Sequence, residues 1–174
     1  MHPTKVERLI LFNQYKILER LDPENADSYQ KMQEILENGY ELEYQWKTEF
    51  ITDDRDVMST DQCRFVINVL SMYEALQRSY DRLSNKGTIE PRMVEFPGFD
   101  GNHEPKYLGY TRFLINREEK FTYLRTSSDD LNSHFRTLER YRRMLAVWRE
   151  LGESYDLTSE QIQAILNAPK LQEA

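Results

Sequence analysis

Cysteine, histidine and long apolar runs are scarce in this chain of 174 residues. Its single cysteine, Cys63, can form neither an intrachain disulfide nor a cysteine zinc site. No apolar run approaches the roughly 20 residues that cross a bilayer, and the start at Met1 has neither the basic nor the apolar stretch of a signal peptide. We therefore expect a cytoplasmic protein that does not enter a membrane.

Positive charge is also in deficit. The chain has 23 lysines and arginines against 30 acidic residues, which gives a net charge of −7 and disfavours nucleic acid as a partner. The charge is unevenly placed: residues 22–61 hold 12 acidic and three basic residues, whereas residues 112–149 hold nine basic and five acidic ones. Two such segments can pack together, pair between subunits or face different partners.

The remaining composition is that of one packed helical core. Hydrophobic residues make up 39% of the chain, 21 residues are aromatic, and the length suits a single domain. Apolar residues recur at spacings of three and four along most of the sequence, as they do in amphipathic helices. We predict a mainly α fold, a single-domain bundle of about six helices over residues 1–168, with a frayed C-terminal tail at residues 169–174.

Capping boxes mark three of the expected helix starts. In this motif a Ser or Thr hydroxyl accepts from a free helix amide, and a side chain three positions later accepts from the amide of the cap residue. The three pairs are Thr4 with Glu7, Ser59 with Gln62, and Thr158 with Gln161.

The segment at residues 40–50 departs from the helical pattern. Apolar residues from Tyr40 to Trp46 alternate with polar ones, which is the period of a half-buried strand. Its glutamates, leucine and lysine favour a helix, so a short helix is the alternative. We predict a short irregular or extended segment here.

A loop at residues 96–104 is the first candidate site. Its glycines allow close backbone approach, and the helix start that follows offers free amides to an anion. The structural alternative is a tight turn at Gly98 and Gly101 whose phenylalanines fill the core. The candidate ligand residues are Gly98, Asp100, His103, Glu104 and Arg112.

A row of arginines is the second candidate site. Arg136, Arg140 and Arg143 are spaced four and three, so all three should project from one helix face. Such a row suits an acidic protein partner or a phosphate backbone. No nucleic-acid-binding motif accompanies it, and pairing of Glu139 with Arg143 on a solvated face is the structural alternative.

Catalysis has little support in the sequence. The three histidines, His2, His103 and His134, lie outside any recognisable nucleophile pattern. No pair of carboxylates stands in the apolar context that separates two pKa values for acid and base work. We can name no reaction, lean against an enzyme, and expect neither a cofactor nor a metal.

Several separated blocks carry a resemblance that extends from about residue 4 to residue 168. They are Arg8–Leu11, Asn13–Lys16, Leu21–Pro23, Met72–Tyr73, Ala75–Leu76, Phe96–Asp100, Tyr107–Tyr110, Tyr141, Met144–Leu145 and Val147–Trp148. In this order they resemble the YfbU family of bacterial cytoplasmic proteins. The resemblance implies a largely helical fold and no established activity, cofactor or catalytic residue.

The leading functional hypothesis is a helical protein-interaction or regulatory module that forms a homo-oligomer. It rests on Leu9–Phe12, which is apolar on every side of a helical turn, because a helix on the surface of a monomer does not need this. The alternative is a protein or enzyme that binds a small anionic ligand through residues 96–104 and Arg112.

Overall fold

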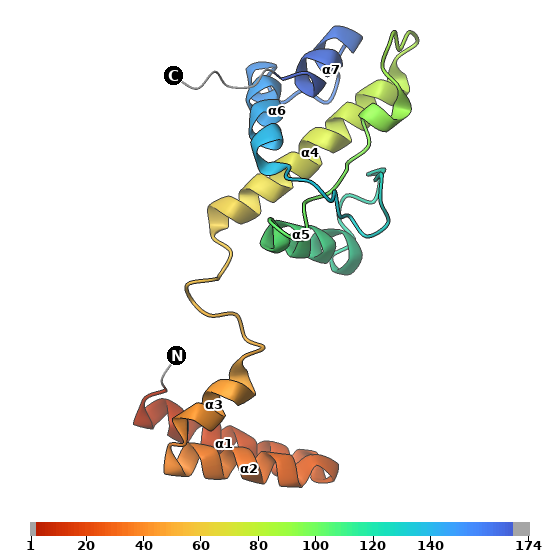
Figure 1. Ribbon diagram of the computed structural model, residues 1–174. Coiled ribbons are helices and arrows are strands. Elements are labelled where there is room, and N and C mark those ends of the chain that lie inside the picture. The colour runs from red at the N-terminus through yellow and green to blue at the C-terminus, as the bar shows by residue number, and fades with distance from the viewer. Residues whose placement is uncertain (1–2, 169–174) are drawn as a thin grey trace, which may run out of the picture. The chain divides into compact units, whose positions relative to one another are not determined.

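A computed structural model describes residues 3–168. The chain divides after Val57 into two compact units, each with its own packing (Figure 1). The described residues hold seven α-helices and no strand, which confirms the predicted mainly α fold. That the two units act as the single domain predicted for residues 1–168 stays a prediction, and the tail predicted at residues 169–174 lies outside the described residues.

The first unit is built on a pair of helices, α1 (Lys5–Leu21) and α2 (Ala26–Asn38), which lie side by side (Figure 1). A 3₁₀ turn at Pro23–Asn25 joins them. The capping box predicted at Thr4 is confirmed, since its hydroxyl accepts from the amide of Glu7 and its own amide donates to the Glu7 carboxylate. The two helices therefore meet in a hairpin.

Residues 41–48 form a third helix, α3 (Glu41–Thr48), so the extended segment predicted at residues 40–50 is wrong over this range. A strand needs a neighbouring strand for its amides and carbonyls, and the described residues provide none beside it. The helix satisfies these groups locally; the Tyr44 amide, for example, donates to the Tyr40 carbonyl at 3.0 Å. Residues 49–57 follow without regular structure.

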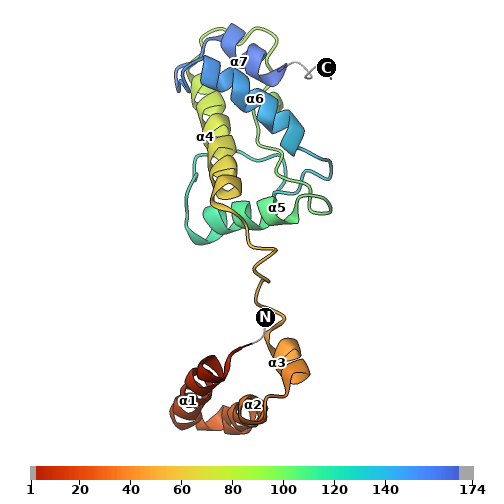
Figure 2. The same ribbon diagram turned by 90° about the vertical axis from the view of Figure 1, so that its left-hand side faces the viewer.

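The second unit is arranged around one long helix, α4 (Thr60–Arg82), against which α5 (Pro105–Arg112), α6 (Leu138–Glu150) and α7 (Ser159–Leu166) pack (Figure 2). A short 3₁₀ turn, Pro91–Met93, follows α4, and a π-helical turn, Phe113–Arg117, extends α5. The capping boxes predicted before α4 and α7 are confirmed.

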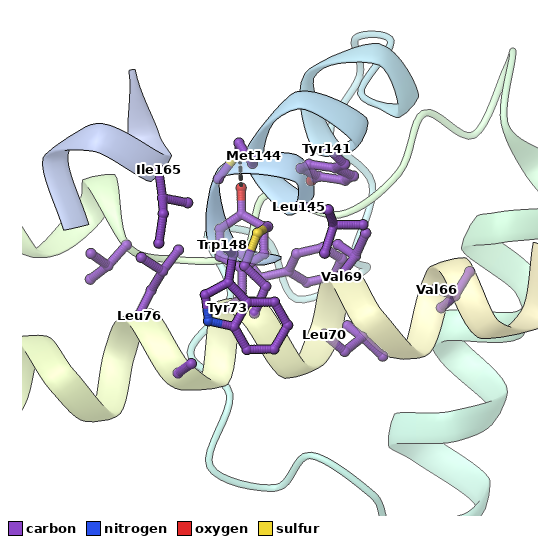
Figure 3. Packing of buried hydrophobic residues seen from close by; sticks show 14 of the residues in the cluster. Val66, Val69, Leu70, Tyr73, Leu76, Tyr141, Met144, Leu145, Trp148 and Ile165 are labelled. Carbon is purple, nitrogen blue, oxygen red and sulfur yellow. Dashed lines mark hydrogen bonds between the residues drawn. The ribbon is translucent and has the colours of Figure 1, made fainter. Parts of the chain in front are cut away.

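The core of the second unit lies between α4 and α6 (Figure 3). The Tyr73 hydroxyl donates to the sulfur of Met144 at 3.9 Å, and both residues are fully buried. Apolar side chains of the two helices interdigitate around this contact. They include Val66, Val69, Leu70 and Leu76 of α4 and Tyr141, Leu145 and Trp148 of α6.

One buried amide, that of Gln77 in α4, connects two loops of the second unit. Its Nε2 donates to the carbonyls of Val94 and Arg125 at 3.0 and 2.8 Å, and its Oε1 accepts from the Arg125 amide at 2.7 Å. The same loops also pair directly, because the Phe96 amide donates to the Arg125 carbonyl. The Gln77 side chain thus pairs with backbone groups of both loops, as a neighbouring strand would do in a sheet.

Replacing this amide should destabilise the second unit. Gln77→Leu leaves the Arg125 amide and the Val94 carbonyl without this partner, and we expect a loss of about 2 to 4 kcal/mol in the free energy of unfolding. Urea titration of proteins in which exposed Trp46 is replaced by Phe measures it, because fluorescence then reports on buried Trp148 alone. Arg64→Leu, at an exposed position of the same helix, is the control and should change stability by less than about 0.5 kcal/mol. Equal effects of the two variants would contradict the role of Gln77.

Candidate functional site

The phenylalanines of the loop at residues 96–104 are part of the core. Phe96 and Phe99 are fully buried, and their rings lie 5.2 Å from Tyr73 and 5.3 Å from Tyr141, respectively, in edge-to-face contacts. Burial raises the pKa of Tyr73 to about 12, so its hydroxyl stays protonated at neutral pH. The aromatic half of the loop therefore anchors it, as the structural alternative to a ligand site requires.

Gly98 is required by close approach to another loop. Its φ of 94° lies in the left-handed region, and a Cβ built at this position would be 1.9 Å from the carbonyl oxygen of Leu131. The Gly98 carbonyl itself accepts from the Tyr141 hydroxyl at 2.6 Å. The α-carbon of Gly98 therefore faces the Leu131 carbonyl, and its carbonyl oxygen is bonded to Tyr141, so both contacts are made within the protein.

The carboxylate of Glu104 joins the loop to α6. The side chain is nearly inaccessible, and its two oxygens accept four hydrogen bonds. Oε1 accepts from the amides of Thr137 and Leu138 at 2.7 and 3.0 Å, whereas Oε2 accepts from the Asp100 amide at 3.0 Å and the Thr137 hydroxyl at 2.7 Å. A charge at this depth is stable because it is fully hydrogen-bonded and caps the positive end of a helix dipole.

Asp100 orders the turn before α5. Its Oδ1 accepts from the Asn102 amide at 3.0 Å, and its Oδ2 contacts Nδ1 of His103. The Asn102 amide and then the His103 ring hold the pKa of Asp100 below its usual value. The His103 side chain is half-exposed, so its ring is fixed at one nitrogen while part of its surface faces solvent.

Arg112 is turned toward a different partner. Its Nε and Nη2 atoms donate to the Asp130 carbonyl at 2.9 and 2.6 Å, and Nη2 lies 3.8 Å from the Asp130 carboxylate. These bonds tie the end of α5 to the loop before α6. Arg112 was predicted to bind a ligand together with residues 96–104, but its donors are directed to the Asp130 carbonyl instead.

The predicted arginine row lies only partly on a helix. Because α6 begins at Leu138, Arg136 precedes it, and the prediction that Arg136, Arg140 and Arg143 project from one helix face is wrong for Arg136. The physical reason is Glu104, whose carboxylate takes the first amides of α6 and so fixes its start.

Two neighbouring arginines of α6 share one ion-pair partner. Arg143 Nη1 lies 3.4 Å from Glu139 Oε1, as the sequence alternative anticipates, and Arg142 Nη1 lies 3.5 Å from Oε2 of the same glutamate. Arg140 lies near the core, where its charge acts to lower the pKa of Tyr73 against the larger effect of burial. The pair of Arg142 and Glu139 is exposed and contributes little to stability, whereas the Arg143 side chain is only 17% exposed.

A surface hollow brings members of both predicted sites together. Its volume is about 400 Å³, and it lies where the loop meets the start of α6. Two of its residues come from the predicted ligand set and one from the arginine row. The lining residues are His103, Glu104, Arg136, Leu138, Glu139 and Arg142.

The exposed apolar side chains of α1 extend well beyond Leu9–Phe12, the apolar turn on which the sequence hypothesis rests. Leu9 and Ile10 are exposed, whereas Leu11 and Phe12 are half-buried. Exposed apolar side chains continue along the whole helix to Leu21. Val6 and Ile10 are four positions apart, as are Ile17 and Leu21, and Ile10 and Ile17 are seven apart, which is the helical period in the sequence that places them on one side of the helix. The exposed apolar residues of α1 are Val6, Leu9, Ile10, Ile17, Leu18 and Leu21.

The described residues contain neither a membrane-spanning helix nor a cluster of metal ligands. Within residues 3–168, no helix combines the length and apolar character needed to cross a bilayer. The same residues bring together no group of three or more histidine, cysteine, aspartate or glutamate side chains with the spacing of metal ligands.

Removing the charge of Glu104 should weaken the second unit. In Glu104→Gln an amide N–H₂ group would face a backbone amide that now donates to an oxygen, and we expect a loss of about 2 to 3 kcal/mol. Urea unfolding followed by Trp148 fluorescence, again with Trp46 replaced by Phe, measures the change. The exposed Glu150 of α6 provides the control, because Glu150→Gln removes the same charge without a buried contact. A loss no larger than that of the control would contradict the capping role.

Asp100 should contribute a pH-dependent part of the stability. A carboxyl whose folded-state pKa is lowered stabilises the fold above its unfolded value of about 3.9, and this contribution is lost as the pH falls through the folded-state pKa. Asp100→Asn should therefore be less stable than the wild type at pH 7, and the gap should narrow below about pH 4. Urea titrations from pH 7 to pH 3 test this, with exposed Asp129→Asn as the control. A gap that stays constant with pH would refute it.

The sequence can be compared with known protein families. The sequence matches the YfbU domain over residues 1–168. The match takes in all seven α-helices and both compact units, so it is not confined to one part of the fold. It confirms the resemblance carried by the separated sequence blocks, and the chain belongs to the YfbU family.

Proposed function

We propose that the protein is a cytoplasmic protein-interaction or regulatory module that associates with a second copy of itself through α1. The observation that carries the proposal is the exposure of this helix, in which no residue is buried. Val6, Ile10, Ile17 and Leu21 expose 67, 52, 57 and 75% of their surface. Exposed aliphatic side chains gathered on one side of a helix are typical of an interaction surface.

The row lies on the side of α1 that faces away from α2. With about 3.6 residues per turn, Val6, Ile10 and Ile17 fall on one side of the helix, and Arg8 and Tyr15 fall on the opposite side. Arg8 Nη1 donates to the Leu36 carbonyl at 3.2 Å, and the ring of Tyr15 lies 6.3 Å from a tyrosine ring of α2. Contact with α2 therefore leaves the aliphatic side of α1 open.

The small core of the first unit supports the same proposal. Among residues 3–57, only Met32, Gln33, Ile35 and Leu36 are buried. Domains of about 60 residues have marginal stability even with a full core, and oligomerisation is a common way to stabilise them. Covering each half-exposed aliphatic side chain is worth roughly 1 kcal/mol, so pairing of two such rows would contribute several times that amount.

The alternative, binding of a small anionic ligand by residues 96–104 with Arg112, has less support. The Glu104 carboxylate has its four donors within the protein, and Arg112 donates to Asp130. The hollow beside His103 and Arg136 is the place where such a ligand, or an acidic protein partner of the arginine row, would bind. Both remain predictions, as does the absence of enzyme activity.

A charge in the aliphatic row should break self-association. Ile10→Glu places a carboxylate in the proposed contact on both copies, and we expect the dissociation constant to rise at least about tenfold. Light scattering coupled to size-exclusion chromatography over a range of concentrations measures the mass. Circular dichroism checks that helix content at high dilution matches that of the wild type.

The matched control is Met93→Glu, which introduces the same charge at an exposed apolar residue of the second unit. It should associate as the wild type does. A wild-type protein that stays monomeric at high concentration would overturn the proposal, and so would an Ile10→Glu variant that associates with unchanged affinity.

A further inference from the structure

The exposed row of α1 has the spacing of a coiled-coil seam. Val6, Ile10, Asn13 and Ile17 are separated by four, three and four positions, and all four are exposed. Val6 and Asn13 are seven positions apart, as are Ile10 and Ile17, and a repeat of seven with this four-three alternation is the pattern of a seam that faces a second helix. The helix has 17 residues and is about 25 Å long, which is enough for three to four layers of contact.

We propose that this seam pairs with α1 of a second copy in parallel and in register, so that Asn13 meets Asn13 of the other copy. The inference rests on the proposed self-association and adds its geometry. Each layer of a parallel pair sets a residue against its own equivalent, so Ile10 meets Ile10 and Ile17 meets Ile17. The apolar layers then enclose one polar layer.

The polar layer decides the orientation. An amide side chain carries both an acceptor and two donors, so two Asn13 side chains can satisfy one another across a parallel seam. An antiparallel pair that keeps the seam would set Val6 against Ile17 and Ile10 against Asn13. The amide would then face isoleucine without a partner, and burying an unpaired amide is unfavourable.

The residues beside the seam permit the parallel arrangement. In a parallel pair each residue on one flank faces the residue five positions later on the other helix. Lys16 would face Leu21, and Leu9 would face Gln14, so no like charges meet. The charges are therefore neutral toward orientation, and Asn13 supplies the specificity, as a single polar seam residue does in other coiled coils at some cost in affinity.

Disulfide cross-linking of seam positions distinguishes the two orientations. In a full-length Cys63→Ser background, Val6→Cys and Ile17→Cys are made separately, and each is oxidised with glutathione disulfide alone and in an equimolar mixture. The two positions are about 16 Å apart along the helix, so they cannot substitute for one another. In a parallel seam each variant cross-links with itself and the mixture gives no mixed dimer. In an antiparallel seam only the mixture cross-links.

Asn13→Leu tests the role of the amide. Removing the polar layer should tighten association at least threefold and allow mixed cross-links between Val6→Cys and Ile17→Cys chains. Ser28→Cys, at an exposed position of α2, is the cross-linking control and should give no dimer. A mixed dimer as the main product when Asn13 is intact would overturn the parallel register. So would an unchanged product pattern in Asn13→Leu.

The failure of this inference is distinct from that of the proposed function. If the unmodified protein remains monomeric, both fail. If it associates but neither seam position cross-links alone or in mixture, another surface mediates association and only the seam is wrong.

Discussion

The second unit depends on the buried carboxylate of Glu104. Its four hydrogen bonds fix the turn at Asp100, the backbone at Thr137 and the first amide of α6 in one place. Three of the four donors are backbone groups that would otherwise be buried without a partner, and an orphaned amide inside a protein is unfavourable. The start of α6 just after Arg136 is fixed by this contact, and Glu104 also lines the hollow beside Arg136.

The sequence was most informative where the deciding contact is local. The capping boxes at Thr4, Ser59 and Thr158 each close within four residues, and each marks a helix start in the structure. Two errors arose where the deciding contact is distant. The alternating pattern at residues 40–50 lacks the strand neighbour that it would need, and the start of α6 depends on Glu104, which lies 33 positions before Thr137.

The candidate sites show the same difference between local contacts, which the sequence indicates, and distant contacts, which it does not. The sequence correctly indicated that Gly98 and the phenylalanines could be structural, because a turn and a core have local signatures. It could not indicate that His103 and Arg136 line one hollow, since 33 residues separate them. The apolar positions of α1, such as Val6, Ile10 and Ile17, recur at helical spacing and are evident in the sequence. Their exposure is not, because it depends on which side of α1 contacts α2.

The four buried residues of the first unit have a consequence for how the protein responds to its own abundance. If the proposed pairing through α1 occurs, a unit with so small a core would gain stability from it, because binding that selects the folded state stabilises it by mass action. Residues 58–168 keep a core of their own at any concentration. Pairing through α1 would therefore make the helices of the first unit more resistant to proteolysis as the protein concentration rises.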